Sequence, residues 1–112
     1  MSAASRSAAI ACGLAIAIFG ITGCGPSPQE HGAELFDLNC ADCHEQPNPD
    51  LMKQPPKLEG LFSSKTLPSG APATDEQVRK TIIQGLRTMP AFDQRLSKTD
   101  VADLILYLHT LK

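Results

Sequence analysis

The sequence lacks the features that mark several large classes of protein. It contains no tryptophan, and its aromatic side chains are four phenylalanines and one tyrosine. Ten basic residues against twelve acidic ones give a formal charge of −2, which excludes a strongly basic nucleic-acid-binding protein. The longest apolar stretch, residues 8–21, would span about 21 Å as a helix, which is short of the roughly 30 Å hydrocarbon core of a membrane.

The residues that are present suffice for one small domain. The 112 residues leave room for a single domain, and a hydrophobic content of 42% permits a folded core. Nine prolines and eight glycines predict that much of the chain forms loops. Four cysteines and three histidines can bind metals or carry redox chemistry, so their positions are the most informative about function.

The first 23 residues are typical of a bacterial export signal. Arg6 precedes the apolar stretch, which ends in Ile21-Thr22-Gly23-Cys24. These four residues resemble the lipobox of bacterial lipoproteins, in which small residues precede a cysteine that is acylated after cleavage. The resemblance implies that residues 1–23 are a lipoprotein signal peptide and that lipidated Cys24 holds the chain at the periplasmic side of a membrane or at the cell surface. An uncleaved signal anchor is the alternative.

Residues 24–30 are interpreted as a lipid-attached linker. They include two prolines, contain no apolar anchor and show no helical periodicity. Such a short linker would keep the following domain close to the membrane. The folded domain is therefore expected to occupy residues 31–112.

The pattern that carries the chemistry is Cys40-Ala41-Asp42-Cys43-His44. C-x-x-C-H is the attachment signature of c-type haem. Two thiols at this spacing can form thioethers with both vinyl groups of one haem, and the imidazole that follows then lies under the iron as an axial ligand. Two other interpretations stay open here: a Cys40–Cys43 disulfide, which would need a βαβ context, and a zinc site that recruits His31 and His109.

The axial ligand opposite His44 should come from a segment further along the chain that passes to the other face of the haem. Met89 fits this position, because it follows a predicted helix and precedes Pro90, which favours an extended backbone. Met52 lies in a proline-rich stretch only eight residues after His44 and is interpreted as a packing residue. A histidine ligand or an open coordination position is the remaining alternative.

Hydrophobic periodicity predicts three main helices and no convincing strand. The first is expected over residues 31–43, with Gly32 and Phe36 on one face. The second begins near Thr74 and the third after Ser97, because each of these residues starts a capping pattern. Proline- and glycine-rich loops connect them. The predicted fold class is therefore all-α, with long loops around a central group that supplements a small core.

Residues 31–112 resemble a class I cytochrome c with a single haem. In this family the first and last helices cross at close range, and Gly32 and Phe36 match the small residue and the aromatic at that crossing. The resemblance covers about three quarters of the chain. It implies a small fold of about three main helices and long loops around one covalently bound haem c.

Two further segments carry the same resemblance. Residues 55–62 are similar to the family's segment after the attachment site, which implies that the Pro56 carbonyl accepts a hydrogen bond from the axial histidine and that Leu58 packs on the ring. Residues 85–92 resemble the stretch that presents the axial methionine, here Met89.

An iron with histidine and methionine ligands has no open position for a substrate, which favours one-electron transfer over catalysis. The sequence therefore predicts a membrane-anchored electron carrier between respiratory or periplasmic redox proteins, with no nucleic-acid partner and no small-molecule substrate. One alternative is a haem c subunit docked in a dehydrogenase or oxidase complex. Another is a haem enzyme or gas sensor in which Met89 is labile. His31 and His109 are expected to be surface residues without a role.

Overall fold

The computed structural model describes residues 23–112, so the signal peptide expected at residues 1–23 lies outside the described residues apart from Gly23. Five helical segments follow one another along the described chain: α1 (Pro28–Asn39), α2 (Ala41–His44), the 3-10 helix η1 (Leu61–Ser63), α3 (Asp75–Gln84) and α4 (Lys98–Leu108). Residues 23–112 form no strand, and the all-α prediction with three main helices is confirmed. None of the helices in this range has the length and hydropathy needed to span a membrane.

Helix α1 begins earlier than the hydrophobic periodicity predicted. The Ser27 side chain accepts a hydrogen bond from the Glu30 amide, and the Glu30 carboxylate accepts one from the Ser27 amide at 2.7 Å. This reciprocal pair closes a capping box, and Pro28 suits the first helical position because it has no amide hydrogen to leave unpaired. The prediction of a linker over residues 24–30 is therefore wrong for residues 28–30, which form the first turn of the helix.

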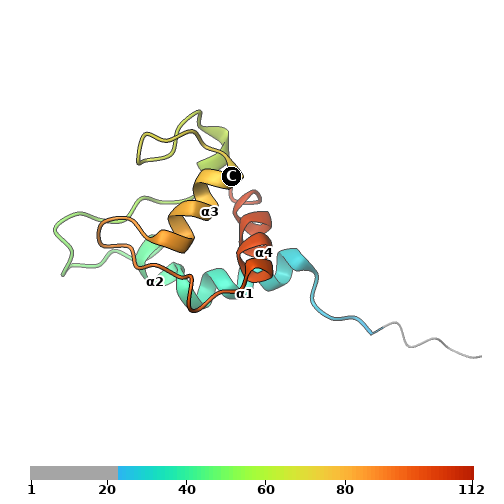
Figure 1. Ribbon diagram of the computed structural model, residues 1–112. Coiled ribbons are helices and arrows are strands. Elements are labelled where there is room, and N and C mark those ends of the chain that lie inside the picture. The colour runs from blue at the N-terminus through green and yellow to red at the C-terminus, as the bar shows by residue number, and fades with distance from the viewer. Residues whose placement is uncertain (1–22) are drawn as a thin grey trace, which may run out of the picture.

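The core forms where α1 crosses α4 (Figure 1). Gly32 lies so close to α4 that a Cβ atom there would collide with the Asp103 carbonyl group and lie 3.0 Å from the Tyr107 Cβ. One turn later, the Phe36 ring is 1% exposed and packs on the Tyr107 ring at a centroid distance of 5.3 Å. The predicted pairing of a glycine and an aromatic with the last helix is thus present in the structure.

Helices α3 and α4 complete the core, and each begins at a cap that the sequence predicted. The Thr74 side chain accepts a hydrogen bond from the Gln77 amide at the start of α3, and Ser97 forms a capping box with Asp100 at the start of α4. Their inner faces contribute the buried side chains Val78, Ile82, Val101, Leu104, Ile105 and Leu108. Long loops, rather than further helices, fill residues 45–60 and 64–74.

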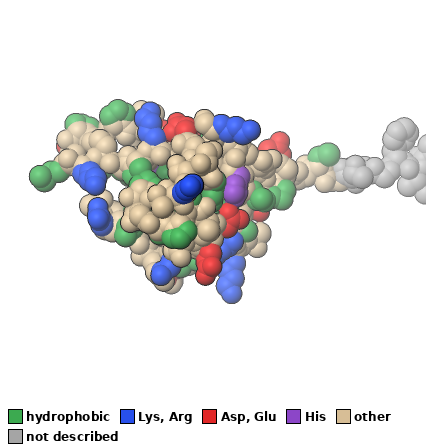
Figure 2. Space-filling model, turned by 90° about the horizontal axis from the view of Figure 1, so that it is seen from above, with side chains coloured by type: hydrophobic (Ala, Val, Ile, Leu, Met, Phe, Trp, Pro, Cys, Tyr) green, Lys and Arg blue, Asp and Glu red, His purple; other side chains and the backbone are tan. Residues whose placement is uncertain are grey.

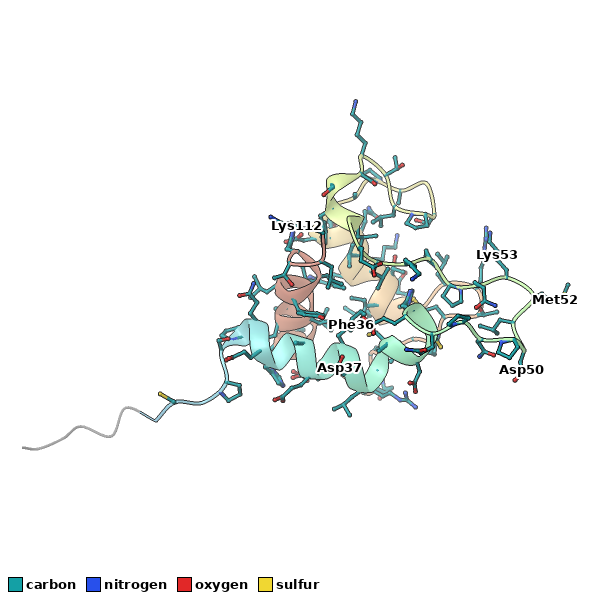
Figure 3. All side chains as sticks on the ribbon, turned by 180° about the vertical axis from the view of Figure 1, so that it is seen from behind. Phe36, Asp37, Asp50, Met52, Lys53 and Lys112 are labelled. Carbon is teal, nitrogen blue, oxygen red and sulfur yellow. The ribbon has the colours of Figure 1, made fainter. Side chains whose placement is uncertain are left out.

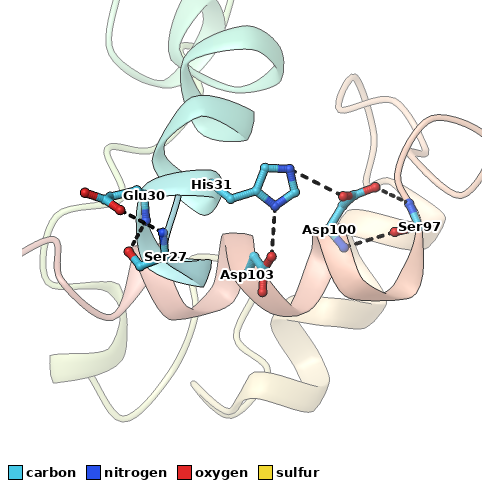
Figure 4. A network of polar contacts seen from close by, with 6 residues as sticks. All are labelled: Ser27, Glu30, His31, Ser97, Asp100 and Asp103. Carbon is cyan, nitrogen blue, oxygen red and sulfur yellow. Dashed lines mark hydrogen bonds and ion pairs between the residues drawn. The ribbon is translucent and has the colours of Figure 1, made fainter. Parts of the chain in front are cut away.

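The histidines outside the C-x-x-C-H pattern tie helices together, so the prediction that they have no role is wrong. On α1, His31 Nδ1 lies 2.8 Å from an Asp103 carboxylate oxygen on α4, and its Nε2 lies 3.7 Å from Asp100 (Figure 4). At the other end of α4, His109 Nε2 lies 2.7 Å from the Asp75 carboxylate, and its ring stacks on Phe62. Both rings remain partly exposed, as expected of surface residues.

The surface of the described residues carries both signs of charge. In the face drawn in Figure 2, basic and acidic side chains are interspersed rather than gathered in separate patches. With a formal charge of only −2 over the whole chain, this distribution gives no strong field to steer a charged partner.

Candidate functional site

The attachment pattern occupies a single turn at the end of α1. The helix breaks at Cys40, whose backbone leaves the helical region at φ −123°, and α2 follows as one turn. The Cys40 carbonyl accepts hydrogen bonds from the amides of Cys43, at 3.1 Å, and His44, at 2.9 Å. These bonds bring the two thiols and the imidazole of the pattern together on one turn.

The two thiols of this turn differ in their surroundings. Cys43 is exposed, whereas Cys40 is partly buried and packs against the hydrophobic core. Burial raises the pKa of the Cys40 thiol to about 11, and the neighbouring Cys43 adds to the shift. Both cysteines are free, and no strand is present in residues 23–112 to provide a βαβ context. The structure therefore gives no support to a thioredoxin-type disulfide.

The imidazole of His44 is oriented by the contact that the resemblance implied. Its Nδ1 lies 2.7 Å from the carbonyl oxygen of Pro56. Because a carbonyl can only accept, Nδ1 must carry the hydrogen and donate it, and the lone pair on Nε2 is then available to a metal. Metal-binding histidines commonly hold their second nitrogen in this way. The chemistry of this donor set therefore fits haem iron.

The segment around Pro56 faces the attachment turn across a shallow hollow. The hollow has a volume of about 150 Å³ and is lined by residues 43–47 on one side and by Gln54, Pro55 and Lys57 on the other. Further along, Leu58 is partly buried and packs against the core. The Gly60 amide donates to the Leu111 carbonyl at 3.0 Å, which ties the segment to the C-terminal end.

Met89 lies in a tight turn that follows α3. The Leu86 amide donates to the Met89 carbonyl at 3.1 Å, and the Met89 amide donates to the Leu86 carbonyl at 3.0 Å. Beyond the turn, the Phe92 amide donates to the Ile82 carbonyl of α3, and the Phe92 ring is buried. Met89 is partly buried against the core, and the loop that follows α3 lies at the same end of the molecule as α2 (Figure 1).

Met52 has the opposite environment. It projects from the tip of the loop between α2 and η1 (Figure 3) and is fully exposed, at 107% of the reference value. The interpretation of Met52 as a packing residue is therefore wrong. Proline-rich sequence around it indicated a loop, but gave no signal of which side chains in that loop face solvent.

The zinc alternative finds no support in the described residues. No group of three or more histidine, cysteine or acidic side chains in residues 23–112 is arranged to hold a metal ion. His31 and His109, the two ligands that a zinc site would have recruited, bind carboxylates near opposite ends of α4. Sequence reasoning missed those carboxylates, because Asp103 is 72 residues from His31 and no local pattern links them.

Comparison with known proteins places this geometry in a family. The family model described as "Cytochrome C oxidase, cbb3-type, subunit III" matches residues 27–108. The cytochrome c subunit of the cytochrome bc1 complex of Corynebacterium diphtheriae is 31% identical over 91 residues, which cover 80% of this chain. Cytochrome c6 of a Picosynechococcus species is 35% identical over 81 residues, 69% of this chain and 68% of that protein.

The lengths of these relatives differ. The chain spans only 30% of the Corynebacterium subunit and 25% of the corresponding subunit of Mycobacterium leprae. Among solved structures, cytochrome c6 of the diatom Phaeodactylum tricornutum aligns with a TM-score of 0.56 and 26% identity, over 71% of this chain and 88% of that one. The match of residues 27–108 shows that the chain belongs to the cytochrome c family, whose cofactor is a covalently bound haem c.

Proposed function

We propose that this protein is a membrane-anchored mono-haem cytochrome that carries single electrons between redox proteins. In this proposal, Cys40 and Cys43 would hold the haem through thioethers, and His44 and Met89 would bind its iron. When bound, the haem supplies a one-electron redox couple in which the thioether ligand favours the reduced iron. The observation that carries the proposal is the His44–Pro56 hydrogen bond, which prepares one nitrogen of the C-x-x-C-H histidine for a metal.

The protein's own residues have distinct parts in this proposal. Pro56 holds the His44 ring in the tautomer that presents Nε2. The Leu86–Met89 hydrogen bonds and the buried Phe92 fix the chain on both sides of the Met89 side chain. Leu58 contributes apolar surface to the wall of the site. A redox partner would approach the site through a small, short-lived interface.

Lipidation of Cys24 would place this site near a membrane. Cys24 is exposed, and only residues 25–27 separate it from α1. Three extended residues reach about 10 Å, and the twelve residues of α1 add about 18 Å up to the attachment turn. The turn would then stay within about 30 Å of the lipid surface. The partners we infer are therefore redox proteins that project from the same membrane.

A second candidate is a haem c subunit that is permanently docked in an oxidoreductase complex. The relatives support it, because several of them are cytochrome c subunits of the cytochrome bc1 complex. Purification in mild detergent separates the two candidates. A carrier that shuttles is recovered alone, whereas a permanent subunit is recovered in a fixed ratio with the other subunits of its complex.

The ligand set is tested with purified protein and the variants Met89→Ala and Met52→Ala. Addition of each thiol across a vinyl group releases no atoms, so the intact mass should rise by that of one haem. The ferric wild type should show the far-red absorption band of methionine-ligated haem, and Met89→Ala should lose it and bind carbon monoxide when reduced. Met52→Ala is the control and should behave as wild type. A colourless protein with the mass of its polypeptide would refute the proposal.

The anchor is tested separately from the haem. The variant Cys24→Ser should carry haem as the wild type does, but should no longer pellet with membrane vesicles. If Cys24→Ser still pellets with vesicles that contain no other protein, lipidation is not what holds the chain there.

A further inference from the structure

Gly85 ends α3 in a backbone conformation that few other residues can adopt. Its amide donates to the Thr81 carbonyl at 2.8 Å, which closes the last turn of the helix. Its φ of 71° and ψ of 173° lie in a region that is essentially restricted to glycine. The chain therefore leaves α3 in a direction that a residue with a side chain would not take.

The same glycine faces the backbone of the methionine segment. A Cβ atom at position 85 would lie 2.5 Å from the Met89 carbonyl oxygen, 2.9 Å from the Ala91 nitrogen and 2.9 Å from the Pro90 carbonyl carbon. All three are backbone atoms, so no side chain can rotate away to make room. Positions 85 and 89–91 can approach this closely only because residue 85 has no side chain.

The methionine segment has little freedom to move away from such a Cβ atom. The Leu86 and Met89 backbones are hydrogen-bonded to each other on one side of Pro90, and the Phe92 amide is bonded to Ile82 on the other. A side chain at position 85 would therefore have to break these bonds or displace residues 89–91 as a unit. Either change moves the Met89 sulfur.

From this juxtaposition we propose that Gly85 is a positioning residue for the axial methionine, and that it acts by letting the Met89–Ala91 backbone lie directly against the end of α3. The inference rests on the proposed ligand role of Met89 and adds the residue that sets where the Met89 sulfur lies. Gly85 itself touches neither the iron nor a partner in this proposal.

A second glycine in the chain provides a control for alanine at positive φ, although its ψ of 13° is that of a left-handed helix and differs from the 173° of Gly85. Gly60 has the same φ of 71°, but no atom lies within 4 Å of a Cβ built there. Gly60→Ala therefore introduces an alanine at positive φ without displacing a neighbour. Arg87, at φ 56° in the same turn as Met89, provides a second control, because glycine adopts that φ readily, so Arg87→Gly should keep the Leu86–Met89 hydrogen bonds and does not fill the space next to Met89.

The experiment compares Gly85→Ala with Gly60→Ala and Arg87→Gly as purified haem proteins. In Gly85→Ala we expect the far-red methionine–iron band to fall, the midpoint potential to drop and the reduced protein to bind carbon monoxide. A tenfold larger fraction of iron with Met89 released gives about tenfold tighter apparent carbon monoxide binding. Both controls should keep the band and the potential of the wild type, even where their melting temperature falls.

If Gly85→Ala is less stable than the wild type but keeps its band, midpoint potential and carbon monoxide affinity, the inference is overturned. Gly85→Ala/Pro90→Gly is a second variant for the case in which Gly85→Ala does not fold, because removing the proline ring lets the segment yield. A folded double variant that lacks the band while Pro90→Gly alone keeps it supports the inference, and a double variant with the same band as Pro90→Gly contradicts it. If Met89→Ala keeps the wild-type band, the ligand assignment fails instead, independently of Gly85.

Discussion

The helical stretch from α1 to α2 has a histidine near each end, and the two make the same kind of bond to different acceptors. Nδ1 of His31 lies 2.8 Å from a carboxylate oxygen of Asp103, and Nδ1 of His44 lies 2.7 Å from the carbonyl oxygen of Pro56. A carboxylate carries a charge that favours the protonated ring, whereas a neutral carbonyl only orients the ring. The Asp103 carboxylate therefore favours the protonated imidazole of His31, whereas the Pro56 carbonyl fixes the orientation of the His44 ring.

The surroundings of the second ring nitrogen reinforce this difference. Nε2 of His31 lies 3.7 Å from Asp100, a second carboxylate that favours protonation of the His31 ring (Figure 4). The His44 ring borders a hollow whose other lining residues include no carboxylate except the neighbouring Glu45. One end of the stretch is therefore held to α4 by a histidine–carboxylate contact, and at the other end a backbone carbonyl orients the imidazole that we propose as a haem ligand.

The largest effect that should separate the two histidines is on haem binding. We expect His44→Ala to abolish the low-spin haem spectrum, because the iron loses the axial ligand that the Pro56 carbonyl orients. His31→Ala should leave that spectrum unchanged, since His31 binds only carboxylates of α4. Reduced-minus-oxidised spectra of the two purified variants measure this. Equal loss of the spectrum in both would mean that the distinction drawn from their acceptors is wrong.

The next largest effect concerns packing beside His31. Gly32→Ala should lower the free energy of unfolding by about 3 kcal/mol, because its Cβ atom would overlap the Asp103 backbone and force α1 away from α4. The sign is informative, since alanine in place of glycine usually stabilises a helix by about 1 kcal/mol. Chemical denaturation followed by circular dichroism gives the value.

Leu38→Ala is the control for that experiment. Leu38 lies near the end of α1 that carries the haem-binding turn and is 80% exposed, so its truncation should change stability by less than about 0.5 kcal/mol. If Gly32→Ala were as stable as Leu38→Ala, the close approach of α1 to α4 would not be a determinant of this fold.

The helices could be predicted from the sequence because the forces that start and bury them are local. Ser97 and Asp100 stand three residues apart, and the apolar side chains of α4 recur at helical spacing, so both the start and the buried face were readable. The start of α1 was misplaced although its signal was present. Ser27 and Glu30 form the same capping pattern, but the prolines nearby favoured a linker over a helix that begins with Pro28.

The site could be predicted in part, and for a different reason. The thiols and His44 follow from the spacing that haem attachment requires, but the Pro56 contact came from the family resemblance rather than from any spacing rule. The positive φ of Gly85 and the exposure of Met52 depend on how loops pack against helices. No local pattern encodes that packing, so neither feature was anticipated.

The smallest effect is a pH dependence at His31. The hydrogen bond to Asp103 raises the pKa of His31 above its usual value of 6.5, and the charges of Asp103, Asp100 and Glu34 add to the rise, although burial opposes it. A raised pKa in the folded state means that the contribution to stability is fully present below the unfolded pKa and is lost as pH rises through the folded one. The difference in melting temperature between wild type and His31→Gln should therefore be larger at about pH 5.5 than at about pH 8.5.

Asp103→Asn is the matched test of that dependence, because it removes the largest cause of the shift while keeping a side chain of similar shape. In the Asp103→Asn background, His31→Gln should change the melting temperature less, and this change should depend less on pH. The melting temperature of His31→Gln/Asp103→Asn should therefore be close to that of either single variant, as expected for two partners of one interaction. The loss of stability at low pH involves a different group, Asp100. Ser97 hydrogen bonds lower the pKa of Asp100, so its contribution is lost only as pH falls through that lowered value. A wild-type advantage over His31→Gln that grew from pH 5.5 to 8.5 would contradict the assignment of His31 as the cationic end of the stretch.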